Sequence, residues 1–350
     1  MQRGYHSSRS VGRSVTLPAV SVLLPVYNCE RYIGAAIESI LQQSFTDFEF
    51  LIVDDGSIDN TPAILATYTD DRIRLFRHAN RGLAATLNFG ISQSRGRYVA
   101  RQDQDDLSLP HRLERQVAHL DAHSECVLLG SWAQIIEIDQ LSKRFHRHPT
   151  HNAELKYGLL FNNPFVHSSV ILRRSAVLAA GGYSTDPQRQ PPEDYELWSR
   201  LARRHEIANL GEVLLHYREV PGSMSRTGIS PFLSNVVSFS SENISAASGV
   251  SADDQDLVAI SKLTHGIPLN QKYKPNFERM KSLLFQAIDS FALGEERTPL
   301  KHDAIERINS LKATWSLSKV GLWPLLRHQG FLRSAAKRLW TLRPRSIRIK

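Results

Sequence analysis

Residues 48–62 read FEFLIVDDGSIDNTP, and the change of pattern within this stretch decides the fold. Phe48–Val53 is an apolar run with aromatic and β-branched residues, as expected of a buried strand. Thr61 is a good helix N-cap, and Pro62 suits the first position of a helix. The Asp-Gly pair could form a hairpin turn instead, but a helical pattern follows it and not a second strand. The stretch therefore predicts a strand, a polar loop and a helix.

The same unit recurs on both sides of this stretch. Upstream, the apolar run Val20–Leu24 leads through PVYN into a predicted helix, whose apolar face is Ile33, Ala36, Ile37, Ile40 and Leu41. Downstream, strands are predicted over 72–76 and 98–101, each followed by a helix. This alternation predicts an α/β fold, a single Rossmann-like domain with a mostly parallel central sheet.

Three polar loops follow predicted strands: PVYN at 25–28, DDGS at 54–57 and DQDD at 103–106. Ligands of open α/β sheets bind beyond the carboxyl ends of the strands. We therefore expect these loops to form one site.

The later part of the chain is expected to be α+β and then helical. The predictions are a helix ending near Phe161, a strand over Val166–Leu172, a short helix ending at Gly181-Gly182, and a helix carrying Leu197, Trp198 and Leu201. A serine-rich stretch after Ser225 precedes a helical C-terminal region.

Composition and charge exclude several classes of protein. The chain has 350 residues, 41% of them hydrophobic, and a formal charge of +8. Eleven Lys and Arg and no acidic residue lie at 307–350, so the preceding residues carry a net charge of −3. Nucleic-acid binding is therefore not expected. The first 18 residues lack the apolar segment of a signal peptide, and no apolar run is long enough for a transmembrane helix. Two cysteines make no disulfide framework, so a cytoplasmic location is expected.

The loop DQDD places Asp103, Asp105 and Asp106 within four positions. Carboxylates this close repel one another and need a compensating charge when buried. Such hard oxygen ligands suit Mg²⁺ or Mn²⁺. The alternative is an acidic loop that caps the next helix, and the cluster alone does not decide between them.

In order, the segments VSVLLPVYN, FLIVDDGSIDNT, NRGLAATLNFGI and GRYVARQDQDDLSLPHRLERQ closely resemble the family 2 glycosyltransferases, over residues 20–116. The resemblance extends more weakly to about Met224. It implies a type A glycosyltransferase fold that uses a nucleotide sugar. It also implies nucleotide contacts from Pro25, Tyr27, Asn28, Asp54, Asp55 and Asp103, and Mg²⁺ or Mn²⁺ bound by Asp103, Asp105 and Asp106.

The segment PPEDYELW resembles the part of the family that supplies the general base, which makes Asp194 the candidate, with Glu193 beside it. Acidic residues are also favoured at helix N-termini for structural reasons. That position should keep Asp194 ionised but not strongly basic. One base and one metal imply a single displacement with inversion at the anomeric carbon.

On the acceptor side the resemblance implies His167, and Trp198 is a weaker candidate. A hydrogen-bonded histidine at a strand edge and a core tryptophan are the alternatives. Similar sequences often carry a histidine where this chain has Val220, in HYREVPGSMS, and there it helps to hold the diphosphate or metal. His216, Arg218 or Arg226 could substitute, because arginine in particular binds phosphate well.

The resulting domain prediction has four parts. Residues 1–18 are a flexible tail, 19–135 the donor and metal half of the catalytic domain, 136–226 its acceptor half, and 227–350 a helical region. Within the last part, 325–350 has the pattern of a basic amphipathic helix that lies on an anionic membrane, or of a solvated end.

The expected function is transfer of a sugar from a nucleoside diphosphate, expected to be UDP, to a glycan or lipid-linked acceptor in surface polysaccharide synthesis. A nucleotidyltransferase and a non-catalytic sugar-nucleotide-binding protein are the alternatives. The sequence leaves open the sugar, the linkage, the choice between Mg²⁺ and Mn²⁺, and the oligomeric state.

Overall fold

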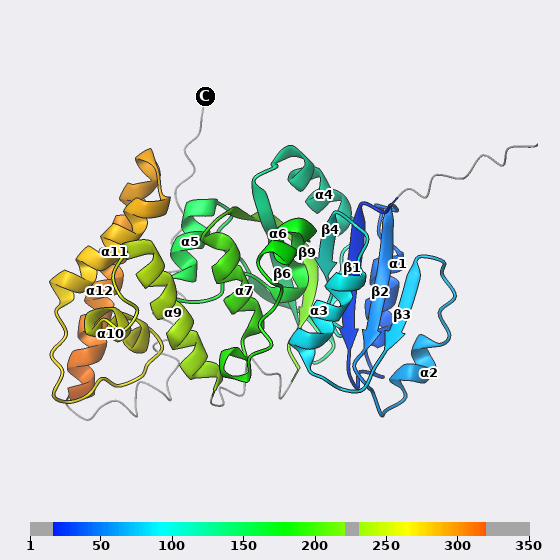
Figure 1. Cartoon of the computed structure of the whole chain (residues 1–350), viewed down its shortest axis with the longest axis horizontal. Helices are drawn as coiled ribbons and strands as arrows, with labels where there is room; N and C mark the ends of the chain where they lie inside the picture. The colour runs from blue at the N-terminus through cyan, green and yellow to red at the C-terminus, as the bar shows by residue number, and fades with distance from the viewer. Residues whose placement is uncertain (1–16, 221–230, 320–350) are drawn as a thin grey trace, which may run out of the picture.

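The computed structural model describes residues 17–220 and 231–319, and a nine-stranded sheet forms its centre (Figure 1). The strand order is β3-β2-β1-β4-β8-β6-β9-β5, and β7 pairs with β6 outside this path. The strands are β1 Val20–Val26, β2 Phe48–Asp54, β3 Ile73–Arg77, β4 Tyr98–Arg101, β5 Leu107–Ser108, β6 Cys126–Glu137, β7 Gln140–His146, β8 Ile171–Arg173 and β9 Glu206–Arg218.

Four adjacent strands are parallel, as predicted: β3, β2, β1 and β4. Every residue of β1 and β2 is buried, because helices cover both faces of this half. The helices between β1 and β9 are α1 Ile33–Leu41, α2 Thr61–Leu65, α3 Leu83–Gln93, α4 Arg112–Ala122, α5 Asn152–Leu159, α6 Arg174–Ala179 and α7 Glu193–Ala202. One face packs on α1 and α4, and the other packs on α3 and α7. The α/β fold class is confirmed.

The second half of the sheet is mixed and was largely missed by sequence reasoning. β8 is antiparallel to both β4 and β6, whereas β6 runs parallel to β9. The register between β6 and β9 shifts around Ser131, Trp132 and Ala133. These bulges interrupt the alternation of apolar and polar residues by which a strand is recognised in sequence.

Two predicted elements differ from the structure. Residues Val166–Leu172 were expected to be one strand, but His167–Ser169 forms a 3₁₀ turn and only Ile171–Arg173 is a strand. The Ser169 hydroxyl donates to the Val166 carbonyl at 2.8 Å, and such side-chain bonds compete with extended backbone. Thr61 starts α2 and is not its N-cap, because its hydroxyl accepts the Cys29 N–H at 2.9 Å.

The C-terminal helices have a core of their own. They are α9 Phe232–Ser248, α10 Gln255–Thr264, α11 Phe277–Phe291 and α12 Arg297–Lys319. Their apolar residues pack together with residues of α5 and the turn after it. Figure 1 shows these helices at the opposite end of the molecule from β3. The helical region is confirmed, while its predicted start at 227 lies outside the described residues. No helix within 17–220 and 231–319 is long and apolar enough to cross a membrane.

One close helix-to-sheet contact depends on a glycine. A Cβ added to Gly90 of α3 would lie 2.1 Å from a methyl of Leu23, which is itself only 1% exposed. A side chain at residue 90 would have to displace this buried methyl, so the close approach of α3 to β1 suits a glycine.

We predict that Gly90→Ala lowers the free energy of unfolding by about 1–3 kcal/mol, because the added methyl overpacks the core. Gly34→Ala in α1 is the matched control. Its added Cβ would make an ordinary 3.6 Å contact with the Tyr68 hydroxyl. That variant should be neutral or stabilised by up to about 1 kcal/mol. Urea unfolding measures both, and equal midpoints would contradict the packing argument.

Candidate active site

The loops PVYN and DDGS are joined directly at the carboxyl edge of β1 and β2. Asn28 has a φ of +48°, a conformation that asparagine adopts more readily than most residues. Its side-chain oxygen accepts the Ile58 N–H at 2.9 Å, and its own N–H donates to the Ser57 hydroxyl at 3.0 Å. Asn28 therefore fixes the relative position of two loops predicted to hold the nucleotide.

The loop DQDD is joined to PVYN through Gln104. The Gln104 side chain accepts the Tyr27 N–H at 2.8 Å and donates to the Tyr27 carbonyl at 3.3 Å. The Tyr27 residue is 44% exposed, whereas Pro25 is buried within β1. The structure thus brings the three predicted loops into one cluster.

Both aspartates of DDGS are buried and hold the backbone of this cluster. Asp54 accepts the Ser57 N–H at 2.9 Å and lies 3.1 Å from the Arg77 Nε. Asp55 accepts the N–H groups of Arg81 and Gly82 at 2.9 and 3.0 Å, at the start of α3. A carboxylate oxygen can accept a second donor, so contact with a nucleotide remains a prediction for both residues.

The three aspartates of DQDD lie in different surroundings. Asp103 forms a 2.5 Å ion pair with the buried Arg101. Asp106 is fully buried and accepts the Ser168 hydroxyl and, at 2.7 Å, the Arg218 N–H. Asp105 makes no ion pair with a described residue. Burial, and next the negative charge of Asp103, raise its pKa to about 6.

The cluster is compensated in part by buried arginines that sequence reasoning missed. Arg112 of α4 donates to the Gln102 side chain at 3.0 Å and to the Arg101 carbonyl at 2.5 Å. Burial lowers the pKa of Arg112 to about 9, although the charge of Asp106 opposes this shift. A sequence signal existed, since Arg112 and Gln116 stand one turn apart beside the apolar residues of α4.

The residues present fit a divalent cation that completes its shell with substrate oxygens. Among residues 17–220 and 231–319, no three His, Cys, Asp or Glu side chains are grouped closely enough to hold a metal alone. Mg²⁺ in nucleotide sites is usually bound by one or two carboxylates together with phosphate oxygens and water. Asp103 and Asp105 are suited to such a shared site, since burial destabilises the ionised form of Asp105. Both oxygens of Asp106, by contrast, already accept hydrogen bonds from the protein.

Of the three substitutes for the absent histidine at position 220, Arg218 reaches the acidic loop. Its Nε donates to the Asp105 carbonyl at 3.0 Å, and its guanidinium stacks on the Tyr32 ring at 4.3 Å. His216 pairs with Leu107 across β9 and β5, and Arg226 lies outside the described residues.

Asp194 lies at the start of α7, and its carboxylate is held by two donors. The Asn163 side chain donates to one oxygen at 2.7 Å, and the Tyr195 N–H donates to the other at 2.7 Å. Burial, the charge of Glu193 and the charge of Asp103 raise the pKa of Asp194 to about 7, although both donors lower it. Burial therefore outweighs the helix terminus, which was expected to keep Asp194 ionised. Asn163 was not anticipated from the sequence.

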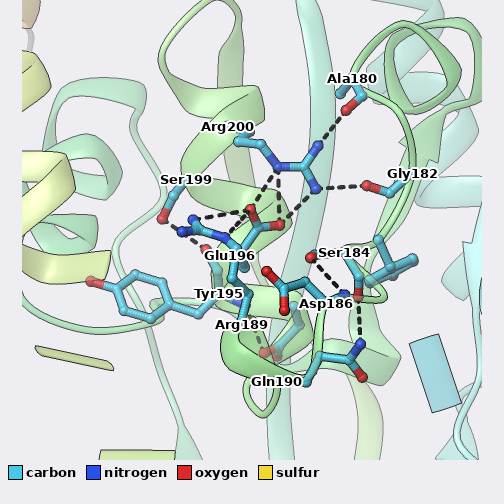
Figure 2. Close-up of polar contacts among 12 residues, drawn as sticks. Ala180, Gly182, Ser184, Asp186, Arg189, Gln190, Tyr195, Glu196, Ser199 and Arg200 are labelled. Atoms are coloured by element: carbon cyan, nitrogen blue, oxygen red, sulfur yellow. Dashed lines mark hydrogen bonds and ion pairs between the residues drawn. The ribbon is translucent and has the colours of Figure 1, made fainter. Parts of the chain in front are cut away.

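Figure 2 shows how α7 and the segment before it are fixed. Glu196 pairs with Arg200 at 2.6 Å and with Arg189 at 3.3 Å. Arg200 also donates to the carbonyls of Ala180 and Gly182. These bonds tie the segment 180–190 to the helix that carries Asp194.

Helix α9 supports the same region from the other side. The Asn235 side chain donates to the Pro191 carbonyl at 3.0 Å, just before Glu193. The Asn243 side chain donates to the Leu159 carbonyl and the Ser199 hydroxyl, both at 2.8 Å. The C-terminal helices thus contact both segments that position the candidate base and its donor Asn163.

The two acceptor-side candidates are buried. His167 shares a 3.0 Å hydrogen bond with the Tyr183 hydroxyl and lies 3.9 Å from Glu193, and burial lowers its pKa to about 3. Burial also raises the pKa of Glu193. Trp198 is fully buried between the rings of Phe165, His167 and Tyr183. The structure therefore favours the core alternative for Trp198, whose ring offers no face to a sugar.

Comparison with known proteins agrees with this arrangement. The model of glycosyl transferase family 2 matches residues 21–181. The chain is 35% identical over 205 residues to the amylovoran biosynthesis glycosyltransferase AmsE of Erwinia amylovora, a match that covers 57% of this chain and 75% of AmsE. It is 28% identical over 213 residues to the UDP-Glc:alpha-D-GlcNAc-diphosphoundecaprenol beta-1,3-glucosyltransferase WfgD of Escherichia coli, over 59% of this chain and 79% of WfgD.

A solved structure shares the fold beyond the part that the family model matches. TarS of S. aureus, residues 1–349 in complex with UDP-GlcNAc, superposes with a TM-score of 0.57 at 21% identity, over 86% of this chain and 92% of TarS. The fold, the three joined loops and the AmsE match together show that this chain belongs to glycosyl transferase family 2.

Proposed function

We propose that this protein is an inverting glycosyltransferase that moves a sugar from a UDP-sugar to a hydroxyl group of a growing polysaccharide or lipid-linked glycan. The observation that carries the proposal is the buried Asp194 carboxylate, which the Asn163 side chain and the Tyr195 N–H hold at the start of α7. Burial, then the charge of Glu193 and that of Asp103, raise its pKa to about 7. A general base is most effective when its pKa lies near the working pH. WfgD, which is named for a UDP-Glc donor and a diphosphoundecaprenol acceptor, supports the substrate classes.

In this mechanism Asp194 accepts the proton of the acceptor hydroxyl as the oxygen bonds to the anomeric carbon. The bond from that carbon to the diphosphate breaks, and the nucleoside diphosphate leaves with the electron pair. One displacement inverts the configuration at the carbon. Asn163 orients the Asp194 carboxylate, and the neighbouring charge of Glu193 keeps it basic.

At the donor end, Asp105 and Asp103 would hold Mg²⁺ or Mn²⁺. A divalent cation there stabilises the negative charge that develops on the departing diphosphate. Arg218 lies beside this loop and is proposed to fill the role of the missing histidine, because its cationic side chain favours phosphate. Pro25, Tyr27, Asn28, Asp54 and Asp55 are proposed to form the nucleoside side.

Contact of the C-terminal tail with an anionic membrane is a further part of the proposal. Residues 325–350 lie outside the described residues, so it depends on their sequence pattern alone. A nucleotidyltransferase would release pyrophosphate, whereas the proposed reaction releases UDP.

We predict that the protein, given Mn²⁺ and a panel of nucleotide sugars, releases UDP from a UDP-sugar, and that Asp194→Asn lowers kcat by about 10²–10⁴-fold, because the base is lost. UDP affinity, measured by isothermal titration, should be unchanged. Asp186→Asn is the matched control, an exposed carboxylate that caps only the Gln188 N–H at 2.9 Å. Full activity of Asp194→Asn would contradict the proposal, as would formation of a nucleotide sugar and pyrophosphate from a nucleoside triphosphate and a sugar 1-phosphate.

The pH dependence follows from the same group. Asp194 must be ionised to accept a proton, so kcat/KM should rise with pH and level off above about 7. Asn163→Ser removes a donor that favours the ionised form, so the inflection should move to higher pH. Asn309→Ser, at an exposed asparagine of α12, should leave the inflection in place. If kcat/KM is constant from pH 5 to 9, about two units on each side of the expected inflection, Asp194 is excluded as the base.

For Asp105 we predict opposite effects on stability and binding. Its folded pKa of about 6 lies above the ordinary value of about 3.9, so the folded state binds this proton more tightly than the unfolded state does. Stability is therefore lost as the pH rises through this window. Asp105→Asn should raise the Tm of the free protein at pH 8, by an amount that shrinks toward pH 4. The same variant should lose the gain in UDP affinity that Mn²⁺ provides; if that gain persists, Asp105 is not a ligand.

A further inference from the structure

The hairpin of β6 and β7 has an unusual turn. Glu137 pairs with Gln140, so the turn consists of Ile138 and Asp139 alone, with φ angles of +48° and +62°. Two-residue hairpin turns with positive φ at both positions strongly favour Asn-Gly. Isoleucine is β-branched and is strained in this conformation. Fold stability alone therefore gives no reason for an isoleucine at the tip.

The same tip is apolar and exposed. Ile138 is 95% exposed, more than any other large hydrophobic side chain that the structure describes. Leu141 and Phe145, on one face of β7, are 53% and 38% exposed. An exposed apolar group of this kind is typical of a contact surface.

Basic side chains lie along β7 and just after its end, beside Leu141 and Phe145. Lys143 stands between Leu141 and Phe145 on the same face and has no ion pair among the described residues. The Arg147 guanidinium stacks on Phe145 at 4.6 Å. By contrast, the nearby carboxylates are paired: Glu137 and Glu219 with Arg144, and Asp139 with Arg31 and Arg218.

The turn is connected to the donor loop through one side chain. The two oxygens of Asp139 each lie 2.5 Å from a guanidinium nitrogen, one of Arg31 and one of Arg218. Arg218 in turn donates to the Asp105 carbonyl and, through its backbone, to the Asp106 carboxylate. The tip therefore lies next to the rim of the candidate active site.

We propose that the β6–β7 hairpin tip docks on an anionic membrane, with Ile138, Leu141 and Phe145 in the headgroup region and the basic side chains on lipid phosphates. Apolar residues flanked by Lys and Arg suit this surface. Pairing of β7 with another strand fits less well, because charged side chains on an edge strand oppose it. The docking would turn the candidate active site toward acceptors held in the membrane. This part of the inference rests on the proposed function.

The two cysteines allow a direct test on the full chain. Cys29 and Cys126 are both buried, and burial raises both thiol pKa values, so neither is expected to react readily. A single cysteine introduced as Ile138→Cys can then carry an environment-sensitive nitrobenzoxadiazole label. Leu293→Cys, at a side chain that is 73% exposed in the C-terminal region, is the matched control site.

With vesicles of phosphatidylglycerol and phosphatidylcholine in equal parts, the label at 138 should shift to the blue and be quenched by spin-labelled lipid. The label at 293 should do neither, and pure phosphatidylcholine should have little effect. Protein that sediments with the vesicles without any change at 138 would overturn the proposal and assign binding to another segment. A blue shift that appears without vesicles when the protein concentration is raised would overturn the proposal and indicate self-association.

A second variant separates docking from folding and from catalysis. Ile138→Asn relieves the strained turn, so it should raise the Tm while it lowers the vesicle-bound fraction by at least about threefold. UDP release in the absence of vesicles should be unchanged, so a failure of the proposed activity is distinguishable from a failure of docking. If vesicle binding is unaltered in this variant, the hairpin is not the docking element.

Discussion

The candidate site depends on one electrostatic constraint, the burial of more carboxylates than the neighbouring cations neutralise. Asp103, Asp105 and Asp106 share one loop, and the pair Glu193 and Asp194 lies near enough for the charge of Asp103 to raise the pKa of both. Three arginines compensate in part. Arg101 pairs with Asp103, Arg112 donates to the Arg101 carbonyl, and Arg218 donates to the Asp105 carbonyl and, through its backbone N–H, to Asp106. The carboxylate charge that is not neutralised leaves a negative electrostatic potential. This potential attracts a cation and makes a neighbouring carboxylate a better proton acceptor. The free enzyme thus bears a cost in stability that its substrates are suited to relieve.

The parallel half of the fold could be predicted because its signals are local. A buried strand such as β2 and a helix face such as that of α1 can each be recognised within about ten residues. β6 and β9 are longer and bulged, and the turn Ile138-Asp139 has none of the residues that mark a hairpin. Because their pairing is with distant strands, the second half of the sheet could not be predicted from local pattern.

For the site, the sequence predicted which loops meet but not what holds them. Gln104 occupies the variable position of the acidic motif, yet it joins that loop to Tyr27 across 77 residues of sequence. Asn163 and Asp194 are likewise brought together only by the packing of α5 against α7. Asp194 itself was found by resemblance, but the effect of burial on its pKa was not foreseen. The burial of Asp194 depends on the whole fold, whereas its position at a helix N-terminus was the only feature of its surroundings that could be read from the local sequence.

The contacts of α9 have a consequence for how such proteins can diversify. Asn235 and Asn243 hold the segments that carry Asp194 and Asn163, so the candidate base is framed by residues far along the chain from the loops PVYN, DDGS and DQDD. Exchange of the C-terminal helices between relatives would therefore exchange part of the frame of the reaction centre. The loops PVYN, DDGS and DQDD, by contrast, are held by contacts among themselves and make no such demand on the C-terminal helices.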